Sequence, residues 1–221
     1  MKIFQVSDIH GRLDIAELIP ERAEDLKADL IVIAGDITHF GGAEEAEEVL
    51  RIISRAKLPI FFVSGNCDPP DLLSWRPKEL NAKNLHGSTQ ELMGVVFIGV
   101  GGGSGKFKTL TELEEEEFEE ILRKFEDISG DFVLVSHSPP WGLDVDFTGV
   151  KHIGSKAIRR FIEDRQPILM CTGHAHEGRG VAKLGRTTIV NAGPAKNGYC
   201  ALISLEEGAV EVELLTIHPK D

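Results

Sequence analysis

The chain of 221 residues is short of basic charge. It has 24 lysine and arginine residues against 36 aspartate and glutamate residues, which gives a formal net charge of −12. Nucleic acids and anionic membranes attract basic surfaces, so we expect neither of them as a partner. A small phosphorylated substrate stays compatible with this charge, because one local site can be positive in an acidic protein.

Cysteines and long apolar runs are also scarce. The three cysteines, Cys67, Cys171 and Cys200, are odd in number and widely spaced, which argues against a disulfide framework and favours a reducing compartment. The longest apolar runs, such as residues 30–34, are far shorter than the roughly 20 residues that cross a bilayer. The first residues do not read as a cleaved export signal. These absences predict a cytoplasmic protein.

The composition is that of a globular protein, with 42% apolar and 27% charged residues. There is no internal repeat and no linker rich in proline or serine. The glycine-rich stretch 101–105 is the one candidate boundary, but a split there leaves two halves of marginal size. We therefore expect one domain over residues 1–221 that contains two sheets.

Apolar patterning in the first third of the chain predicts strands that alternate with helices. Strands are expected at residues 3–7, 30–34 and 60–64, part of a helix at 20–28, and a second helix at 43–56. This order favours a parallel sheet with right-handed crossovers, whose strands are buried on both faces.

From about residue 85 the pattern changes to shorter strands interrupted by two helices. Residues 111–114 have capping-box spacing and are expected to open the first helix, and Ser155 is expected to cap the second. The acidic run 114–117 is interpreted as a solvated helix face near its N-terminus, where negative charge is favourable. The expected strands are 95–100, 132–136, 168–172, 187–191, 200–205 and 210–216.

Five short segments carry metal-type ligands directly after predicted strands. In an extended chain residues i and i+2 point to the same side, so two of these segments each present a ligand pair. Sites in parallel sheets form outside the carboxyl ends of the strands, so we expect the five segments to converge. They are Asp8-Ile9-His10, Gly35-Asp36, Gly65-Asn66-Cys67-Asp68, Ser136-His137 and Gly173-His174-Ala175-His176.

Each segment alone is a weak signal, since Gly-Asp is more often a turn than a ligand. Together they place seven ligand-type side chains at strand ends, and buried charges need partners, so a purely structural explanation is poor. The mixed oxygen and imidazole donors suit Mn²⁺, Fe²⁺, Zn²⁺ or Ni²⁺ better than an all-oxygen cage for Mg²⁺ or Ca²⁺. The identity of the ion stays open.

In this order and spacing the five segments resemble the calcineurin-like metallophosphoesterase family, most closely its class III cyclic-nucleotide phosphodiesterase-like branch. The resemblance implies a mixed α/β fold, a four-layer α-β-β-α sandwich of two mixed sheets flanked by helices. It also implies two divalent metal ions that share a bridging hydroxide as nucleophile. One ion would be held by Asp8, His10, Asp36 and His176, and the other by Asp36, Asn66, His137 and His174.

In that family Asp36 would bridge the ions, and Asn66 would act with the bridging water in catalysis. The phosphatase form of the third segment has a histidine that faces the substrate, where this chain has Cys67. A thiol with an ordinary pKa is a poor acid for an alkoxide leaving group, which favours phosphodiesters, such as cyclic nucleotides or other small diesters. Cys67 as a simple space-filler is an equally open interpretation.

Four further residues are candidates around such a site. Cys67, His39 and Trp141 are candidate substrate contacts, and Asp68 is a candidate for holding a neighbouring ligand in place. The alternatives are that His39 is simply exposed and that Trp141 packs its loop onto the body of the protein.

The sequence thus predicts a metal-dependent phosphoric ester hydrolase that acts on a small phosphoester. A phosphomonoesterase or nucleotidase of the same fold is an alternative, as is a non-catalytic binding scaffold, although all seven ligand residues are present. A nuclease is disfavoured because the chain is acidic and has no basic stripe. The physiological substrate and the oligomeric state stay open, a homo-oligomer among the possibilities.

Overall fold

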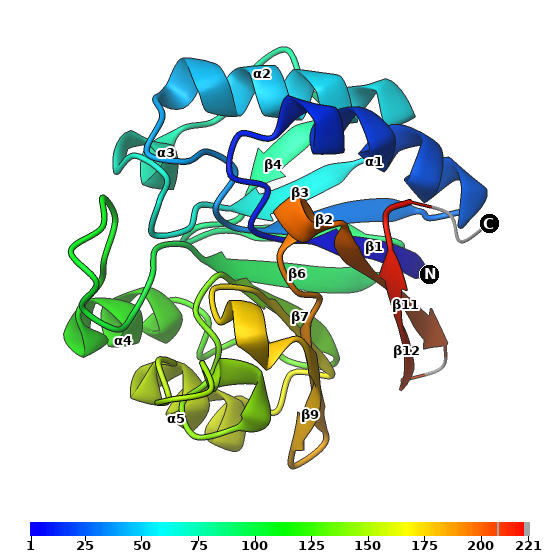
Figure 1. The fold of residues 1–221 in the computed structure, drawn as a ribbon. Coiled ribbons are helices and arrows are strands. Elements are labelled where there is room, and N and C mark those ends of the chain that lie inside the picture. The colour runs from blue at the N-terminus through cyan, green and yellow to red at the C-terminus, as the bar shows by residue number, and fades with distance from the viewer. Residues whose placement is uncertain (207, 219–221) are drawn as a thin grey trace.

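The computed structural model describes residues 1–206 and 208–218 and contains two six-stranded mixed sheets packed face to face. Helices α1 (Leu13–Asp25) and α2 (Ala43–Ile53) cover the outer face of one sheet, and α4 (Glu115–Arg123) and α5 (Lys156–Arg165) cover the outer face of the other (Figure 1). The arrangement has four layers, helix, sheet, sheet and helix, as the family resemblance implied.

The first sheet has the order β12-β11-β1-β2-β3-β4. Strands β1 to β4 run parallel, and β11 and β12 are added antiparallel at the β1 edge. A 3-10 turn at Ser54–Ala56 continues α2, and a short helix α3 (Asp71–Ser74) precedes β4. The strands are β1 (Lys2–Val6), β2 (Leu30–Ala34), β3 (Ile60–Val63), β4 (Ala82–Asn84), β11 (Tyr199–Glu206) and β12 (Ala209–Thr216).

The second sheet has the order β5-β6-β7-β8-β10-β9. Its four central strands are parallel, and antiparallel strands flank them at both edges. Short 3-10 turns lie at Asp144–Asp146, His176–Gly178 and Ala195–Asn197. The strands are β5 (Thr89–Leu92), β6 (Val95–Val100), β7 (Phe132–Ser136), β8 (Leu169–Thr172), β9 (Gly180–Leu184) and β10 (Thr187–Asn191).

The apolar core is divided into three layers that explain the continuous apolar strands. In β2, Ile31 and Ile33 pack toward α1 and α2, while Leu30 and Val32 pack toward the other sheet, so both faces of the strand are buried. The third layer lies under α4 and α5, where Phe118 and Phe161 pack on the outer face of the second sheet. Within the described parts of the chain, no helix combines the length and apolar character needed to span a bilayer.

Several local expectations need correction. The first helix begins at Leu13, because its apolar face already starts with Ile15 and Ile19, and it ends at Asp25, so the part of a helix expected at 20–28 extends three residues too far. The apolar pattern did not predict β4, β5 and β9, which lie at sheet edges, since β4 and β5 are short and carry few apolar residues and β9 is exposed or half-buried along its whole length. Such strands are formed by pairing with a neighbour rather than by their own pattern.

The two predicted helix caps had different outcomes. Ser155 caps α5 as expected, and its hydroxyl accepts a hydrogen bond from the Ile158 amide. The capping box of α4 lies at Glu114 and Glu117, so the predicted start at Thr111 is wrong. The Thr111 hydroxyl instead donates a 2.6 Å hydrogen bond to the Asp68 carbonyl and ties this loop to the segment after β3.

Candidate metal centre

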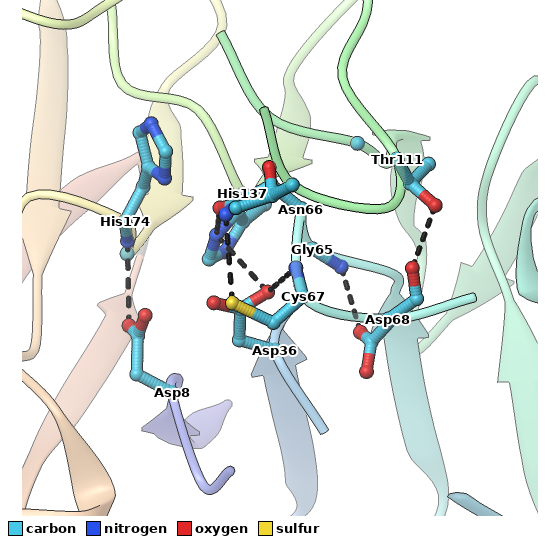
Figure 2. Close-up of polar contacts among 12 residues, drawn as sticks. Asp8, Asp36, Gly65, Asn66, Cys67, Asp68, Thr111, His137 and His174 are labelled. Carbon is cyan, nitrogen blue, oxygen red and sulfur yellow. Dashed lines mark hydrogen bonds and ion pairs between the residues drawn. The ribbon is translucent and has the colours of Figure 1, made fainter. Parts of the chain in front are cut away.

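The five ligand-bearing segments meet at one end of the sandwich. They follow the carboxyl ends of β1, β2 and β3 in the first sheet and of β7 and β8 in the second. Figure 2 shows Asp8, Asp36, His137 and His174 gathered between the two sheets. The predicted convergence is therefore present in the fold, since parallel strands deliver their following loops to the same edge.

The backbone brings these side chains together by turning rather than by staying extended. Asp8, His10, Asp36 and His174 have φ values of 56°, 51°, 52° and 67°, in the left-handed region. The extended geometry assumed for Asp8 with His10 and for His174 with His176 is therefore wrong. Left-handed backbone at such residues is strained and clusters at functional sites.

Hydrogen bonds between the first two segments hold this strained backbone. The Asp8 amide donates to the Gly35 carbonyl at 3.0 Å, and the His10 amide donates to the Asp36 carbonyl at 2.9 Å. These hydrogen bonds hold the loop after β1 beside the loop after β2. A side chain on the first loop is thereby placed in fixed relation to a side chain on the second.

Two glycines allow the side chains to approach closely. A β-carbon at Gly65 would collide with the Asp36 carboxylate, and a β-carbon at Gly173 would lie 2.6 Å from Oδ2 of Asp8. Glycine is needed at both positions because the buried carboxylate occupies the space that a side chain would fill.

The Asp36 carboxylate lies between two histidines. Its Oδ2 is 3.6 Å from Nε2 of His10, and its Oδ1 is 3.5 Å from Nε2 of His137. The Cys67 amide donates a 2.8 Å hydrogen bond to Oδ1 (Figure 2). The residue is 2% exposed, and burial raises the pKa of its carboxyl above the ordinary value.

The Asp8 carboxylate connects the first segment to the last. Its Oδ1 accepts a 3.1 Å hydrogen bond from Nε2 of His176, and its Oδ2 accepts a 3.3 Å bond from the His174 amide. Burial alone would raise the pKa of this carboxyl, but the bond to His176 and the charge of His137 outweigh burial and lower it.

The two ring nitrogens of His137 face different groups: Nδ1 faces a backbone carbonyl, and Nε2 faces side-chain oxygen atoms. Its Nδ1 lies 2.8 Å from the Ala34 carbonyl, so Nδ1 carries the proton that this acceptor requires. Its Nε2 lies 2.9 Å from Oδ1 of Asn66 and faces Asp36. Burial favours neutral His137, but the Asp36 and Asp8 carboxylates outweigh burial and raise the pKa of His137. The Nε2 position thus requires a proton or a metal cation.

His174 is oriented by a main-chain oxygen. Its Nε2 lies 2.8 Å from the Ser104 carbonyl, and this acceptor fixes the proton on Nε2. The Nδ1 lone pair is left available for a ligand. Burial lowers the pKa of His174 to about 3, and burial likewise lowers the pKa of His10 to about 3, so both rings are neutral at pH 7, as a metal ligand must be.

Two groups of these side chains could each hold a cation. Ligand atoms of Asp8, His10 and His176 lie within 4.8 Å of one another, and so do those of Asp8, Asp36 and His137. His10 Nε2 is buried, faces both carboxylates, and makes no hydrogen bond to any described residue. Buried carboxylates beside an unpartnered imidazole nitrogen are costly without a positive charge between them.

Two of the other sequence candidates, Cys67 and His39, contact residues of this cluster. Cys67 is 7% exposed, and burial together with Asp36 raises the pKa of its thiol. His39 Nδ1 is 3.1 Å from Nδ1 of His10, which places this exposed imidazole at the rim. Ligand atoms of His10, His39 and Cys67 also lie within 4.8 Å of one another.

The contacts of Trp141 and Asp68 are with groups other than the ligand side chains. The Trp141 ring lies beside His152 at 5.8 Å and below the Lys156 ammonium, and its amide is bonded to the Ser155 carbonyl, so these contacts are with its own loop and α5. Asp68 accepts bonds from the amides of Ile37 and Thr38 at 3.1 and 2.7 Å and from Gly65 at 2.7 Å. It thereby fixes the loop that carries Asp36.

Two supporting residues were missed from the sequence. Ser104 acts through its carbonyl, which no side-chain pattern can reveal. The Asn191 amide group donates to the carbonyls of Val145 and Ala175 at 3.1 and 2.8 Å and holds the loop that carries His174 and His176. Its position at the end of an apolar strand is an available signal, since polar candidate ligands also stand where β1, β2 and β8 end.

Comparison with known proteins gives a consistent picture. A family model described as calcineurin-like phosphoesterase matches residues 1–178, which include all seven candidate ligands. An uncharacterized protein from Methanocaldococcus jannaschii is 35% identical over 205 residues, 88% of each chain.

Two solved structures share the fold. A dimetal phosphatase from Danio rerio has a TM-score of 0.68 at 11% identity, covering 99% of this chain and 96% of its own. A novel archaeal phosphodiesterase has a TM-score of 0.57 at 16% identity, covering 97% of this chain and 100% of its own. At such identities the likeness concerns the fold alone.

Proposed function

Because this chain belongs to the calcineurin-like phosphoesterase family, we propose that it is a dinuclear metal-dependent phosphodiesterase that hydrolyses small diesters, among which cyclic nucleotides are candidates. The observation that carries the proposal is the Asp36 carboxylate between Nε2 of His10 and Nε2 of His137. One carboxylate that faces two imidazole nitrogens from different segments is the arrangement that a shared ligand of two cations requires.

The residues divide into two ligand sets. Asp8, His10, Asp36 and His176 would hold one ion, and Asp36, Asn66, His137 and His174 the other, with Mn²⁺, Fe²⁺, Zn²⁺ or Ni²⁺ as candidates. When bound, such a pair of ions activates water toward phosphorus and neutralises charge on the phosphoryl oxygens. With the tautomers set by the Ala34 and Ser104 carbonyls, Nε2 of His137 and Nδ1 of His174 would be the ligand atoms.

Cys67 supports the preference for diesters. Burial and the neighbouring Asp36 raise the pKa of its thiol, so it stays protonated and carries no positive charge toward a dianionic monoester. A thiol is also a weak proton donor for a poor leaving group. Diesters, which carry a single negative charge, and esters with good leaving groups depend least on such assistance.

A phosphomonoesterase is the alternative function, favoured by the structural likeness to a protein described as a dimetal phosphatase. The seven ligand side chains are equally suited to both reactions. The two functions differ in whether residue 67 and the rim of the site supply a proton donor or positive charge to the substrate.

The proposal is tested with protein freed of metal by a chelator and reloaded separately with each of the four ions. Hydrolysis of bis-p-nitrophenyl phosphate and of p-nitrophenyl phosphate is then compared, and bound metal is counted by elemental analysis. We expect two ions per chain and faster hydrolysis of the diester. Faster monoester hydrolysis would support the alternative, and metal binding without hydrolysis of either ester would indicate a non-catalytic scaffold.

A further inference from the structure

Exposed apolar side chains are concentrated on loops at the end of the sandwich that carries the candidate metal centre. In the part of the chain that the structure describes, eight large hydrophobic residues are exposed, and six of them stand on the loops that follow β2, β6 and β7. The exceptions are Met93 and Val181. The six are Phe40, Phe107, Leu110, Trp141, Phe147 and Val150. Such a concentration at one site points to a ligand with an apolar part, because isolated apolar residues are otherwise scattered over a surface.

Among these six residues, Phe107 is the one whose ring packs against a candidate metal ligand. Its ring centroid is 5.7 Å from that of His174, and the rings are nearly perpendicular at 74°. The Lys151 ammonium lies 4.9 Å from the centre of the Phe107 ring, a cation–π contact between two loops. The phenyl ring is still 43% exposed. An apolar ring therefore borders the place where a phosphoryl group would bind.

The loop that carries Phe107 is built to keep the ring there. Gly105 has φ 106°, and a β-carbon at this position would lie 2.5 Å from the Phe107 ring, so the ring lies against bare backbone. The Leu110 and Thr111 amides both donate to the Asn66 carbonyl at 3.0 Å. Ser104 at the start of the loop receives the His174 bond. The loop that carries Phe107 is thus bonded to two candidate ligands, Asn66 and His174.

The surroundings of the ring favour an aromatic ligand over an aliphatic one. The loop that carries Lys151 has an apolar surface made of flat side chains, since Phe147 and Trp141 both contact the ring of His152, the residue after Lys151, at 5.1 and 5.8 Å. The exposed lysines 106, 108 and 151 interrupt this surface, which would hinder burial of a long alkyl chain but complements an anionic ester. Rings that pack on rings gain geometry-dependent energy beyond the area they bury.

We propose that Phe107 forms a specificity subsite beside His174 that packs against a planar aromatic group carried by the phosphoester substrate. The inference rests on the proposed function, because the phosphoryl group must bind at the adjacent metal centre for the ring to reach Phe107. The chemical class of ligand is an aryl or heteroaryl phosphoester.

The test compares phenylphosphonate with methylphosphonate, two anions that differ only in the aromatic ring. Their dissociation constants are measured by calorimetry on the metal-loaded protein. We expect the native chain to bind phenylphosphonate roughly three- to tenfold more tightly than methylphosphonate. Phe107→Leu keeps an apolar side chain and removes the ring, so it should abolish this preference while it changes the methylphosphonate affinity less than twofold.

Met93→Leu is the matched control, since Met93 is exposed and lies before β6, at the opposite end of that strand from the loop of Phe107. It should keep the preference for phenylphosphonate. An unchanged preference in Phe107→Leu overturns the subsite, as does equal binding of the two phosphonates by the native chain or binding of neither. If Phe107→Ala loses the preference for phenylphosphonate while Phe107→Leu keeps it, the subsite requires apolar bulk and no aromatic ring, which also overturns the aromatic assignment.

Hydrolysis of bis-p-nitrophenyl phosphate by the native chain is measured in parallel. If the native chain hydrolyses the diester but Phe107→Leu keeps the phosphonate preference, the subsite is wrong and the proposed function stands. A preference that depends on Phe107, in a protein that hydrolyses no ester, would remove the proposed function and leave the subsite.

Discussion

Nε2 of His176 donates a 3.1 Å hydrogen bond to Oδ1 of Asp8, two residues that stand 168 positions apart in the chain. The bond closes the candidate site, because it joins the first ligand-bearing segment to the last. It also shows how the site depends on the whole sandwich, since β1 and β8 belong to different sheets. Changes to residues that support this closure should therefore affect metal binding as well as stability.

Asp36→Asn should lower metal content from two ions to one or none and reduce diester turnover by a factor of about 100 or more, because the amide cannot supply two anionic oxygens. Elemental analysis and initial rates with bis-p-nitrophenyl phosphate check this. The exposed Asp164→Asn is the control and should behave as the native chain.

The same substitution should stabilise the metal-free protein. Burial raises the pKa of Asp36, so its ionised form opposes folding at neutral pH, and the neutral amide relieves this cost. Thermal unfolding in the presence of a chelator should therefore occur at a higher temperature for Asp36→Asn than for the native chain. A lower unfolding temperature would mean that the Cys67 amide and His137 stabilise the carboxylate more than burial opposes it.

Cys67→His should raise the ratio of monoester to diester turnover about tenfold or more, because an imidazole supplies a proton donor and positive charge beside the substrate. The ratio is measured with p-nitrophenyl phosphate and bis-p-nitrophenyl phosphate. Cys67→Ser is the matched control, since it changes the thiol without adding a base. If Cys67→His leaves the ratio unchanged, Cys67 has only a space-filling role.

Asn191→Ala should weaken metal binding roughly 10- to 100-fold and destabilise the chain by about 1 to 3 kcal/mol, because it removes the donor to the Val145 and Ala175 carbonyls, and both carbonyls lie in buried surroundings. Metal titration and urea unfolding measure the two effects. The exposed Asn197→Ala serves as control. Normal metal affinity in Asn191→Ala would show that the loop with His174 and His176 holds its shape without this residue.

His86 should make stability depend on pH outside the metal centre. Burial lowers the pKa of His86 to about 4, and its Nδ1 accepts a 3.0 Å hydrogen bond from the Gly101 amide, which requires the unprotonated nitrogen. Since the folded pKa lies below the unfolded value of about 6.5, the stabilisation is complete above pH 6.5 and is lost as the pH falls from about 6.5 to 4.

His86→Gln can accept the same hydrogen bond but does not titrate. Its urea unfolding free energy should therefore fall less between pH 7 and pH 5 than that of the native chain, by about 1 to 2 kcal/mol. Other buried histidines titrate in both proteins, so the difference between the two isolates His86. Parallel pH profiles would contradict the assignment.

The order of apolar segments was sufficient to predict one domain with two sheets, the family resemblance implied that they form a sandwich, and the residues after the strands were sufficient to predict which side chains gather. Strands such as β2 are continuous apolar runs, so their burial on two faces follows from hydrophobicity alone. The short edge strands β4, β5 and β9 and the true cap of α4 could not be predicted in this way. They depend on pairing partners and on contacts such as Thr111 with Asp68 that lie far away in the sequence.

The sequence by itself determined the ligand types and their position at strand ends, because residue chemistry and the direction of parallel strands are local properties. Only the tertiary structure decided the left-handed backbone at Asp8 and Asp36, the ring tautomers set by the Ala34 and Ser104 carbonyls, and the place of Phe107 beside His174. These features arise where separate loops meet, and main-chain oxygens and ring contacts leave no pattern in a single segment. The physical reason is that strain and orientation at such a site are balanced by hydrogen bonds between distant parts of the chain.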